Sequence, residues 1–164
     1  MEEKEKKWER TEYIPEDAIR NEITDETIRY AERFGKHLAT PKIVETPRIN
    51  KKTGKEEKSR ETVEKELTSS QLRKFFGEVK RQQMTGYVES SFVLLKPKLA
   101  YAVGRAKSDS NKTIKFYKIE DLYNVLADAI DIVVGKETVD KNKAFRNFIS
   151  IFEAIVAYHK AAEK

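Results

Sequence analysis

The sequence predicts an all-α fold: a compact bundle of about five helices with a flexible N-terminal segment and a basic loop. Every clear apolar periodicity is near 3.6 residues, and no run alternates cleanly between apolar and polar residues. Charged residues make up 37% of the 164 residues, whereas the chain has only 6 glycines and 4 prolines. This composition favours helices with long solvated faces over a sandwich or barrel. The length favours one domain with appendages.

The composition also excludes several classes of protein. The chain has no cysteine, so it cannot form a disulfide framework or a zinc ribbon. It begins MEEKEKKWER, which is charged throughout and lacks the apolar core of a signal peptide. No stretch approaches the roughly 18 uninterrupted apolar residues of a membrane-spanning helix. We therefore expect a cytoplasmic protein without a cofactor.

The first 66 residues are expected to hold one helix between two less ordered segments. Residues 1–23 are predicted to be an acidic, partly disordered segment in which Trp8 and Tyr13 are the exceptions. The first helix is predicted at residues 24–39, with Thr24 or the next residue as its N-cap. Residues 40–66 contain two prolines, a glycine and the largely basic run INKKTGKEEKSR, which predict a basic linker or loop.

Residues 67–164 are expected to form the core of the bundle, and the start of the first helix in this region can be located. Thr68 and Gln71 stand at the N-cap and N3 positions of a capping box. Leu67 and Leu72 take the N′ and N4 positions of a hydrophobic staple. Together these signals predict that the helix begins directly after Thr68.

A further helix is predicted to include residues 94–105. Pro97 either kinks this helix or occupies the N1 position of a new one. Residues 108–111, with the sequence Ser-Asp-Ser-Asn, are predicted to turn the chain.

The last two helices have the strongest apolar stripes, at about residues 119–134, with Gly135 as C′, and about residues 141–162. Ile151 and Tyr158 widen the apolar face of the last helix beyond what one packing seam needs. Such a helix is either central in the bundle or covered by another subunit. An exposed patch of this kind pairs with its own copy about a two-fold axis. We therefore expect an isolated homodimer with Ile151 and Tyr158 as its self-association residues.

Positive charge is concentrated in one segment. Residues 71–118 hold eleven Lys or Arg and three acidic residues, a balance of +8 in a chain of net charge +5. Arg73, Lys80 and Arg81 fall opposite the apolar face of the capped helix. Gly77 interrupts this stripe, which lets a phosphate backbone approach the helix closely. Such a stripe alone suits a solvated surface as well as a nucleic-acid interface, but the repetition of one sign on several elements favours the interface.

Catalytic and metal-binding arrangements are weak in this chain. His159 lies on the apolar stripe of the last helix, where a structural histidine is favoured over a catalytic one, and His37 is expected at the surface. Four polar residues at helical spacing make an acidic stripe: Asp121, Asn124, Asp128 and Asp131. Carboxylates on one straight helix spread over about 15 Å and cannot share one ion. A solvated face is favoured, with a contact to a basic patch on a neighbour as the alternative.

Three blocks of the sequence resemble one family. They are LTSSQLRKFFGEV at residues 67–79, LLKPKLAYAVGR at residues 94–105 and FRNFISIFEAIVAYHK at residues 145–160. In this order and spacing they resemble the small subunit of type III-A CRISPR effector ribonucleoproteins, the Csm complexes. The resemblance covers about residues 67–162.

The resemblance implies a small helical bundle whose copies stack along the inner side of the complex, beside the backbone subunits that bear the crRNA. It implies that the subunit forms a wall of the channel in which crRNA pairs with target RNA. It also implies that the subunit is not the nuclease, since target cleavage belongs to the backbone subunit and DNA cleavage and cyclic oligoadenylate synthesis belong to the large subunit. The expected partners are therefore crRNA, target RNA and these other Csm subunits, with no membrane.

Basic residues of the helical core are the candidate RNA-binding residues. Arg73, Lys74 and Arg105 are carried over from the resemblance because they lie inside the matching blocks. Four more are added on charge and helical phase: Lys80, Arg81, Lys96 and Lys98. Such side chains neutralise phosphates without reading sequence. Two alternatives remain open: a helical protein-interaction bundle without RNA binding, and a small metal-dependent nuclease.

Overall fold

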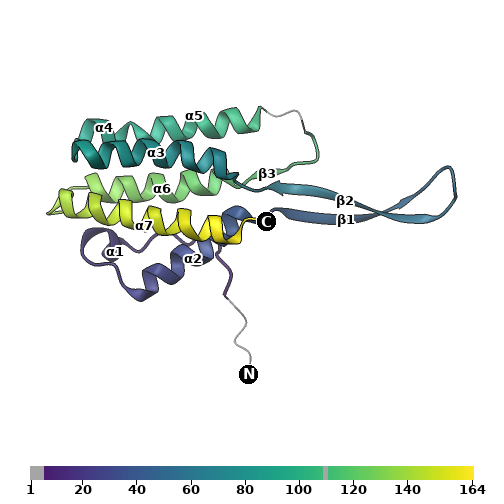
Figure 1. Ribbon diagram of the computed structural model, residues 1–164, viewed down its shortest axis with the longest axis horizontal. Helices are drawn as coiled ribbons and strands as arrows, with labels where there is room; N and C mark the ends of the chain where they lie inside the picture. The colour runs from purple at the N-terminus through teal and green to yellow at the C-terminus, as the bar shows by residue number, and fades with distance from the viewer. Residues whose placement is uncertain (1–5, 109–110) are drawn as a thin grey trace, which may run out of the picture.

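Seven helices and three strands make up the described part of the chain, residues 6–108 and 111–164, in the computed structural model (Figure 1). The helices are α1 (Glu16–Arg20), α2 (Asp25–Ala39), α3 (Ser69–Thr85), α4 (Glu89–Val93), α5 (Leu95–Lys107), α6 (Ile119–Val134) and α7 (Lys141–Ala162). The strands are β1 (Lys42–Ile49), β2 (Glu56–Lys65) and β3 (Phe116–Tyr117). In Figure 1, α6 and α7 run between α3, α4 and α5 on one side and α1 and α2 on the other.

The prediction of an all-α fold is wrong, although the protein is mostly helical. The strands form one three-stranded mixed sheet in the order β1-β2-β3, with β1 antiparallel to β2 and the end of β2 parallel to β3. Residues 40–66, predicted to be a loop, therefore contain a β-hairpin. Every residue of β1 is exposed, so the hairpin buries no face against the core. A strand solvated on both faces needs no apolar alternation, which is why its sequence lacks the usual strand signal.

The hairpin extends well away from the helices (Figure 1). At its tip the backbone NH groups of Asn50 and Gly54 donate to the carbonyls of Lys55 and Asn50, and Gly54 adopts a left-handed φ of 68° that suits glycine. Pro47 lies in β1, which pairs only with β2, so the missing NH of proline can face the open edge of the sheet.

The N-terminal segment packs on the bundle through Trp8. Trp8 is 6% exposed and its ring lies 4.7 Å from that of Phe34. The indole NH of Trp8 donates to the hydroxyl of Tyr30 at 3.2 Å. Residues 1–5 of the predicted disordered segment lie outside the described residues.

The predicted helix starts are confirmed at two caps. The Thr68 side chain accepts from the Gln71 NH at 3.2 Å, and the Thr68 NH donates to the Gln71 side chain at 3.0 Å. Leu67 and Leu72, the two residues of the staple, are each 1% exposed. Thr24 caps α2 in the same way, with Thr27 as its partner.

Three details of the predicted helix ends differ in the structure. Pro97 is the third residue of α5, so it does not occupy N1. The break between α4 and α5 falls at Leu94, within one turn before Pro97. Gly135 is the C-cap of α6 with a φ of −63°, not a left-handed C′ residue. Asp109 and Ser110, the middle of the predicted turn, lie outside the described residues.

Helix α7 occupies the centre of the bundle, where it contacts α1, α2, α3 and α6. Ile151 is 1% exposed and Tyr158 is half-buried against the core, so these two side chains do not form an exposed patch on the single chain. The homodimer stays a prediction. The broad apolar face of α7 is instead covered within the chain. No described helix combines the length and apolarity that crossing a membrane requires.

Candidate nucleic-acid interface

A groove of about 980 Å³ lies between α3 and α5, which run side by side in Figure 1. Its α3 wall includes Gln71, Lys74 and Phe75, and its α5 wall includes Tyr101 and Arg105. The capping box fixes where α3 begins, so it also fixes which side chains of α3 face α5. The apolar residues Leu72 and Val79 on the opposite side of α3 are buried in the core.

Three cations of α3 and α5 are unpaired in the described part of the chain, and two of them line the groove. Arg73, Lys74 and Arg105 are exposed and make no hydrogen bond or ion pair there. Lys74 and Arg105 line the groove from opposite walls, and Arg73 lies next to Lys74 on α3. These three are the residues that the family resemblance selected. The structure therefore brings Lys74 and Arg105 to one groove from two helices, whereas Arg73 does not line it.

The four cations selected on charge and helical phase are each paired with a carboxylate. Lys80 lies 3.6 Å from Glu153, and Lys96 lies 2.7 Å from Asp131. Arg81 and Lys98 share Glu78, at 2.6 Å and 2.8 Å. The Arg81–Glu78 pair is local, at i, i+3, and could be read from the sequence. The other three pairs each join two different helices, so the sequence could not reveal them.

Glu78 is held as an anion by its two partners. Hydrogen bonds from Arg81 and then from Lys98 lower the pKa of Glu78 to about 2. Glu78 lines the groove, so its charge offsets part of the positive charge there. Exposed ion pairs of this kind contribute about 0–1 kcal/mol, so an incoming phosphate can compete for Arg81 and Lys98 at small cost.

The acidic stripe on α6 is not one solvated face. Asp121 is 1% exposed and accepts hydrogen bonds within the chain, and Asp131 is exposed but paired with Lys96. Burial, followed by the charges of Glu16 and Asp131, raises the pKa of Asp128. Within residues 6–108 and 111–164, no three His, Asp or Glu side chains are grouped so that they could hold a metal ion.

The sequence-based prediction is confirmed for one histidine and wrong for the other. His159 is 1% exposed and its Nε2 lies 2.6 Å from the carbonyl oxygen of Leu67, which confirms the structural role predicted for it. The prediction that His37 lies at the surface is wrong. Its ring is half-buried beside Trp8, and its Nε2 lies 2.7 Å from Asp121.

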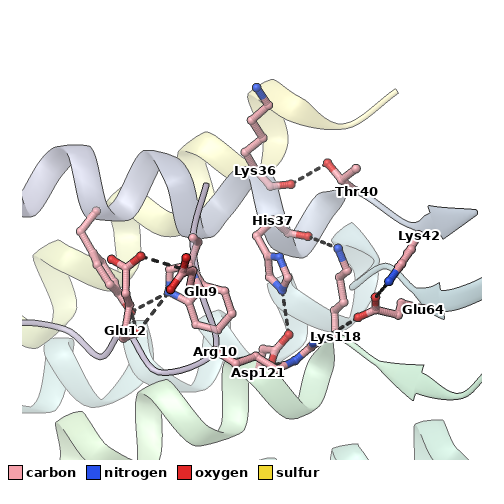
Figure 2. Close-up of polar contacts among 12 residues, drawn as sticks. Glu9, Arg10, Glu12, Lys36, His37, Thr40, Lys42, Glu64, Lys118 and Asp121 are labelled. Atoms are coloured by element: carbon pink, nitrogen blue, oxygen red, sulfur yellow. Dashed lines mark hydrogen bonds and ion pairs between the residues drawn. The ribbon is translucent and has the colours of Figure 1, made fainter. Parts of the chain in front are cut away.

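Asp121 is the centre of a polar cluster at the base of the hairpin, shown in Figure 2. Arg10 donates to Asp121 at 3.1 Å and to Glu64 of β2, and its guanidinium stacks on the ring of Phe116. Lys118 donates to the carbonyl of His37 at 2.9 Å. The cluster ties the N-terminal segment, α2, α6 and the sheet together. It is a structural anchor.

Two charges in this cluster are shifted by their surroundings. Burial lowers the pKa of Lys118, and the nearby carboxylates of Glu64 and Asp121 only partly oppose that shift. The pKa of Glu64 is lowered: burial acts to raise it, but the hydrogen bond and charge of Arg10 outweigh burial.

The cluster was missed because its members are far apart in the chain: His37 and Asp121 are separated by 84 residues, and Arg10 and Asp121 by 111. One signal was present in the sequence. Asp121 shares a helix face with Val125 and Ala129, both of which are buried, so the helical phase places its carboxylate toward the core.

Comparison with known proteins identifies the family. Neither a curated protein nor a solved structure matches the chain. Residues 48–164, from the end of β1 through α7, match the Csm2 Type III-A family. The groove and the unpaired cations Arg73, Lys74 and Arg105 lie within the matched residues. The chain therefore belongs to the Csm2 Type III-A family and is a small subunit of the type III-A Csm complex.

Proposed function

We propose that this protein is a non-catalytic subunit that lines the crRNA/target RNA channel of the type III-A complex and helps to assemble it with the backbone and large subunits. The observation that carries the proposal is the set of unpaired cations, Arg73, Lys74 and Arg105, on two adjoining helices. Lys and Arg side chains bind phosphates and release counterions whatever the base sequence is. That property suits a subunit that serves any guide and any target.

Rigid presentation supports the same role. The capped α3 and the adjoining α5 hold the unpaired cations on helices that are already ordered. The protein backbone therefore loses little conformational entropy when RNA binds. The paired cations Lys80, Arg81, Lys96 and Lys98 extend the basic surface and exchange their carboxylates for phosphates at modest cost.

The test is to replace Arg73, Lys74 and Arg105 by Ala together and to measure single-stranded RNA binding at several salt concentrations. Binding should weaken equally for unrelated sequences. The slope of log affinity against log salt should flatten by about 0.7 per lost contact, or about 2 for the set. The helices should persist, because the three side chains are exposed and alanine is the best helix former.

A matched control removes the same charge elsewhere. Lys136, Lys143 and Arg146 are also exposed and unpaired among the described residues, but they lie at the α6–α7 connection and on α7, away from the groove. Replacing these three by Ala should leave most of the affinity and the salt slope in place. Equal losses in both triple variants would show a nonspecific effect of net charge and would count against the groove.

Assembly is tested by co-purification of the full chain with a backbone subunit and crRNA. Retention of the triple variant in the complex, with weaker target RNA binding, would support a channel wall. A wild-type protein that joins the complex but shows no salt-dependent RNA binding would favour the protein-interaction alternative. Cleavage of labelled RNA with Mg²⁺ or Mn²⁺ by the purified protein would favour the nuclease alternative.

A further inference from the structure

Tyr101 presents a free aromatic ring at the groove. It is 71% exposed, and Tyr13, at 47%, is the other exposed aromatic side chain in the described part of the chain. Tyr101 makes no hydrogen bond, ion pair or ring contact with any described residue. The remaining rings are at least half-buried, and several of them pack against one another. Tyr101 therefore contributes nothing visible to the packing of the bundle.

The ring lies on a defined line along α5. Leu94, Lys98, Tyr101 and Arg105 follow one another at spacings of four, three and four residues, which places them on one face of the helix, and all four line the groove. Lys74 faces them from α3. An exposed ring is thus flanked by cations along its own helix and across the groove.

We propose that Tyr101 is a stacking platform for an unpaired RNA base whose neighbouring phosphates lie against Lys74 and Arg105. This inference rests on the proposed RNA-binding function and adds to it a contact with a base. Aromatic rings in basic grooves hold single strands in this way, and the contact tolerates any sequence because every base has a π-face. The groove alternates ring and cation, which matches the alternation of base and phosphate along a strand.

Charge favours a strand of RNA over a protein segment in this groove. Four cations line it, Lys65, Lys74, Lys98 and Arg105, against two carboxylates, Glu66 and Glu78. One of the four, Lys98, is paired with Glu78, which also pairs with Arg81 outside the groove lining. Lys74 and Arg105 remain as unpaired cations among the described residues of the groove.

The experiment compares Tyr101→Leu with wild type for two ligands: a short single-stranded RNA containing 2-aminopurine, and the same strand paired with its complement. We expect Tyr101→Leu to weaken single-strand binding by roughly fivefold or more and to change duplex binding by less than about twofold. The salt slope should not change, because no phosphate contact is lost. The wild-type protein should quench 2-aminopurine, and Tyr101→Leu should not.

Three further variants separate the causes. Tyr101→Phe keeps the ring and should bind as wild type does. Tyr13→Leu removes the other exposed ring, which lies outside the groove, and should have no effect. Lys74→Ala should weaken both ligands and flatten the salt slope. Quenching of 2-aminopurine by the wild-type protein gives an independent readout if a variant fails to fold.

Each remaining outcome overturns the inference. If Lys74→Ala weakens binding and Tyr101→Leu does not, the stacking role fails and the proposed function stands. If neither affects binding, both fail. If Tyr101→Leu weakens single strand and duplex equally, Tyr101 only shapes the groove. If it releases a backbone subunit without changing RNA affinity, Tyr101 is a protein contact.

Discussion

The Nε2 atom of His37 lies 2.7 Å from Oδ2 of Asp121, and this contact joins the last turn of α2 to the first turn of α6. The second carboxylate oxygen of Asp121 accepts from Arg10 of the N-terminal segment. One buried carboxylate therefore holds two elements that are distant in the sequence. The same Arg10 reaches Glu64, so the base of the hairpin is held through this group as well.

Replacing Asp121 by Ala should destabilise the fold by about 1–3 kcal/mol, because the buried partners lose a charged acceptor. The matched control is Asp131→Ala. Asp131 lies on the same helix as Asp121, but its carboxylate is exposed and is paired with Lys96 of α5. That change should cost less than about 1 kcal/mol. Urea denaturation measures both. Equal losses in the two variants would contradict the anchoring role of Asp121.

Gly35→Ala should be strongly destabilising. A Cβ atom at Gly35 would lie 2.8 Å from the backbone nitrogen of His159 and 2.8 Å from the carbonyl oxygen of Ile155, so α2 and α7 would have to separate. We expect a loss of about 1–3 kcal/mol, as for other overpacked sites. Gly104→Ala is the control, since a Cβ there meets nothing within 4 Å, and it should stabilise α5 by about 0.5–1 kcal/mol. Thermal unfolding of the two variants should shift in opposite directions.

Glu78→Gln should tighten RNA binding. Removing this charge releases Arg81 and Lys98 and raises the net positive charge of the groove. If both cations then meet phosphates, the salt slope should steepen by about 0.7 for each. Titrations at several salt concentrations measure this. Glu137→Gln removes an exposed carboxylate near Arg20 and should have a smaller effect. An affinity and a slope that both stay unchanged in Glu78→Gln would show that these two cations stay off the RNA, whereas tighter binding with an unchanged slope would show that they already contact phosphates in the wild type.

Acid should weaken the fold through Glu78. Its pKa in the folded protein is about 2, below the ordinary value of 4.5, so its contribution to stability is complete above the ordinary pKa and is lost as the pH falls toward 2. Glu64 acts in the same direction. Thermal unfolding between about pH 5 and pH 2 should therefore depend less steeply on pH in Glu78→Gln than in wild type. Parallel curves would rule out this contribution.

The helical core could be predicted because its signals are local. A capping box and a staple marked the start of α3, and the apolar period marked α6 and α7 to within a residue of their observed bounds. Two unpaired groove cations, Lys74 and Arg105, were also named, through the family blocks that contain them. These features depend on residues close together in the chain.

The remaining features depend on partners that the chain brings from far away. The carboxylates paired with Lys80 and Lys96 lie on α7 and α6, and no local sequence pattern predicts these ion pairs. The position of Ile151 was misjudged because a wide apolar face looks the same whether neighbouring helices or a second copy cover it. Tyr101 was overlooked because it lies among the apolar residues of an ordinary amphipathic helix, where the sequence does not distinguish an exposed ring from a buried one.

The solvated hairpin gives this chain a segment that can change length almost independently of the bundle. In most sheets a one-residue slip moves apolar side chains from the core to water, and that penalty fixes the register. Here β1 has no residue facing a core, so the cross-strand pairs from Ile43–Thr62 to Ile49–Glu56 carry little such penalty. Insertions or deletions of residue pairs near the tip would leave the anchor at Glu64 and the helices untouched. Evolution or design can therefore alter the length of this hairpin more freely than the packed helices.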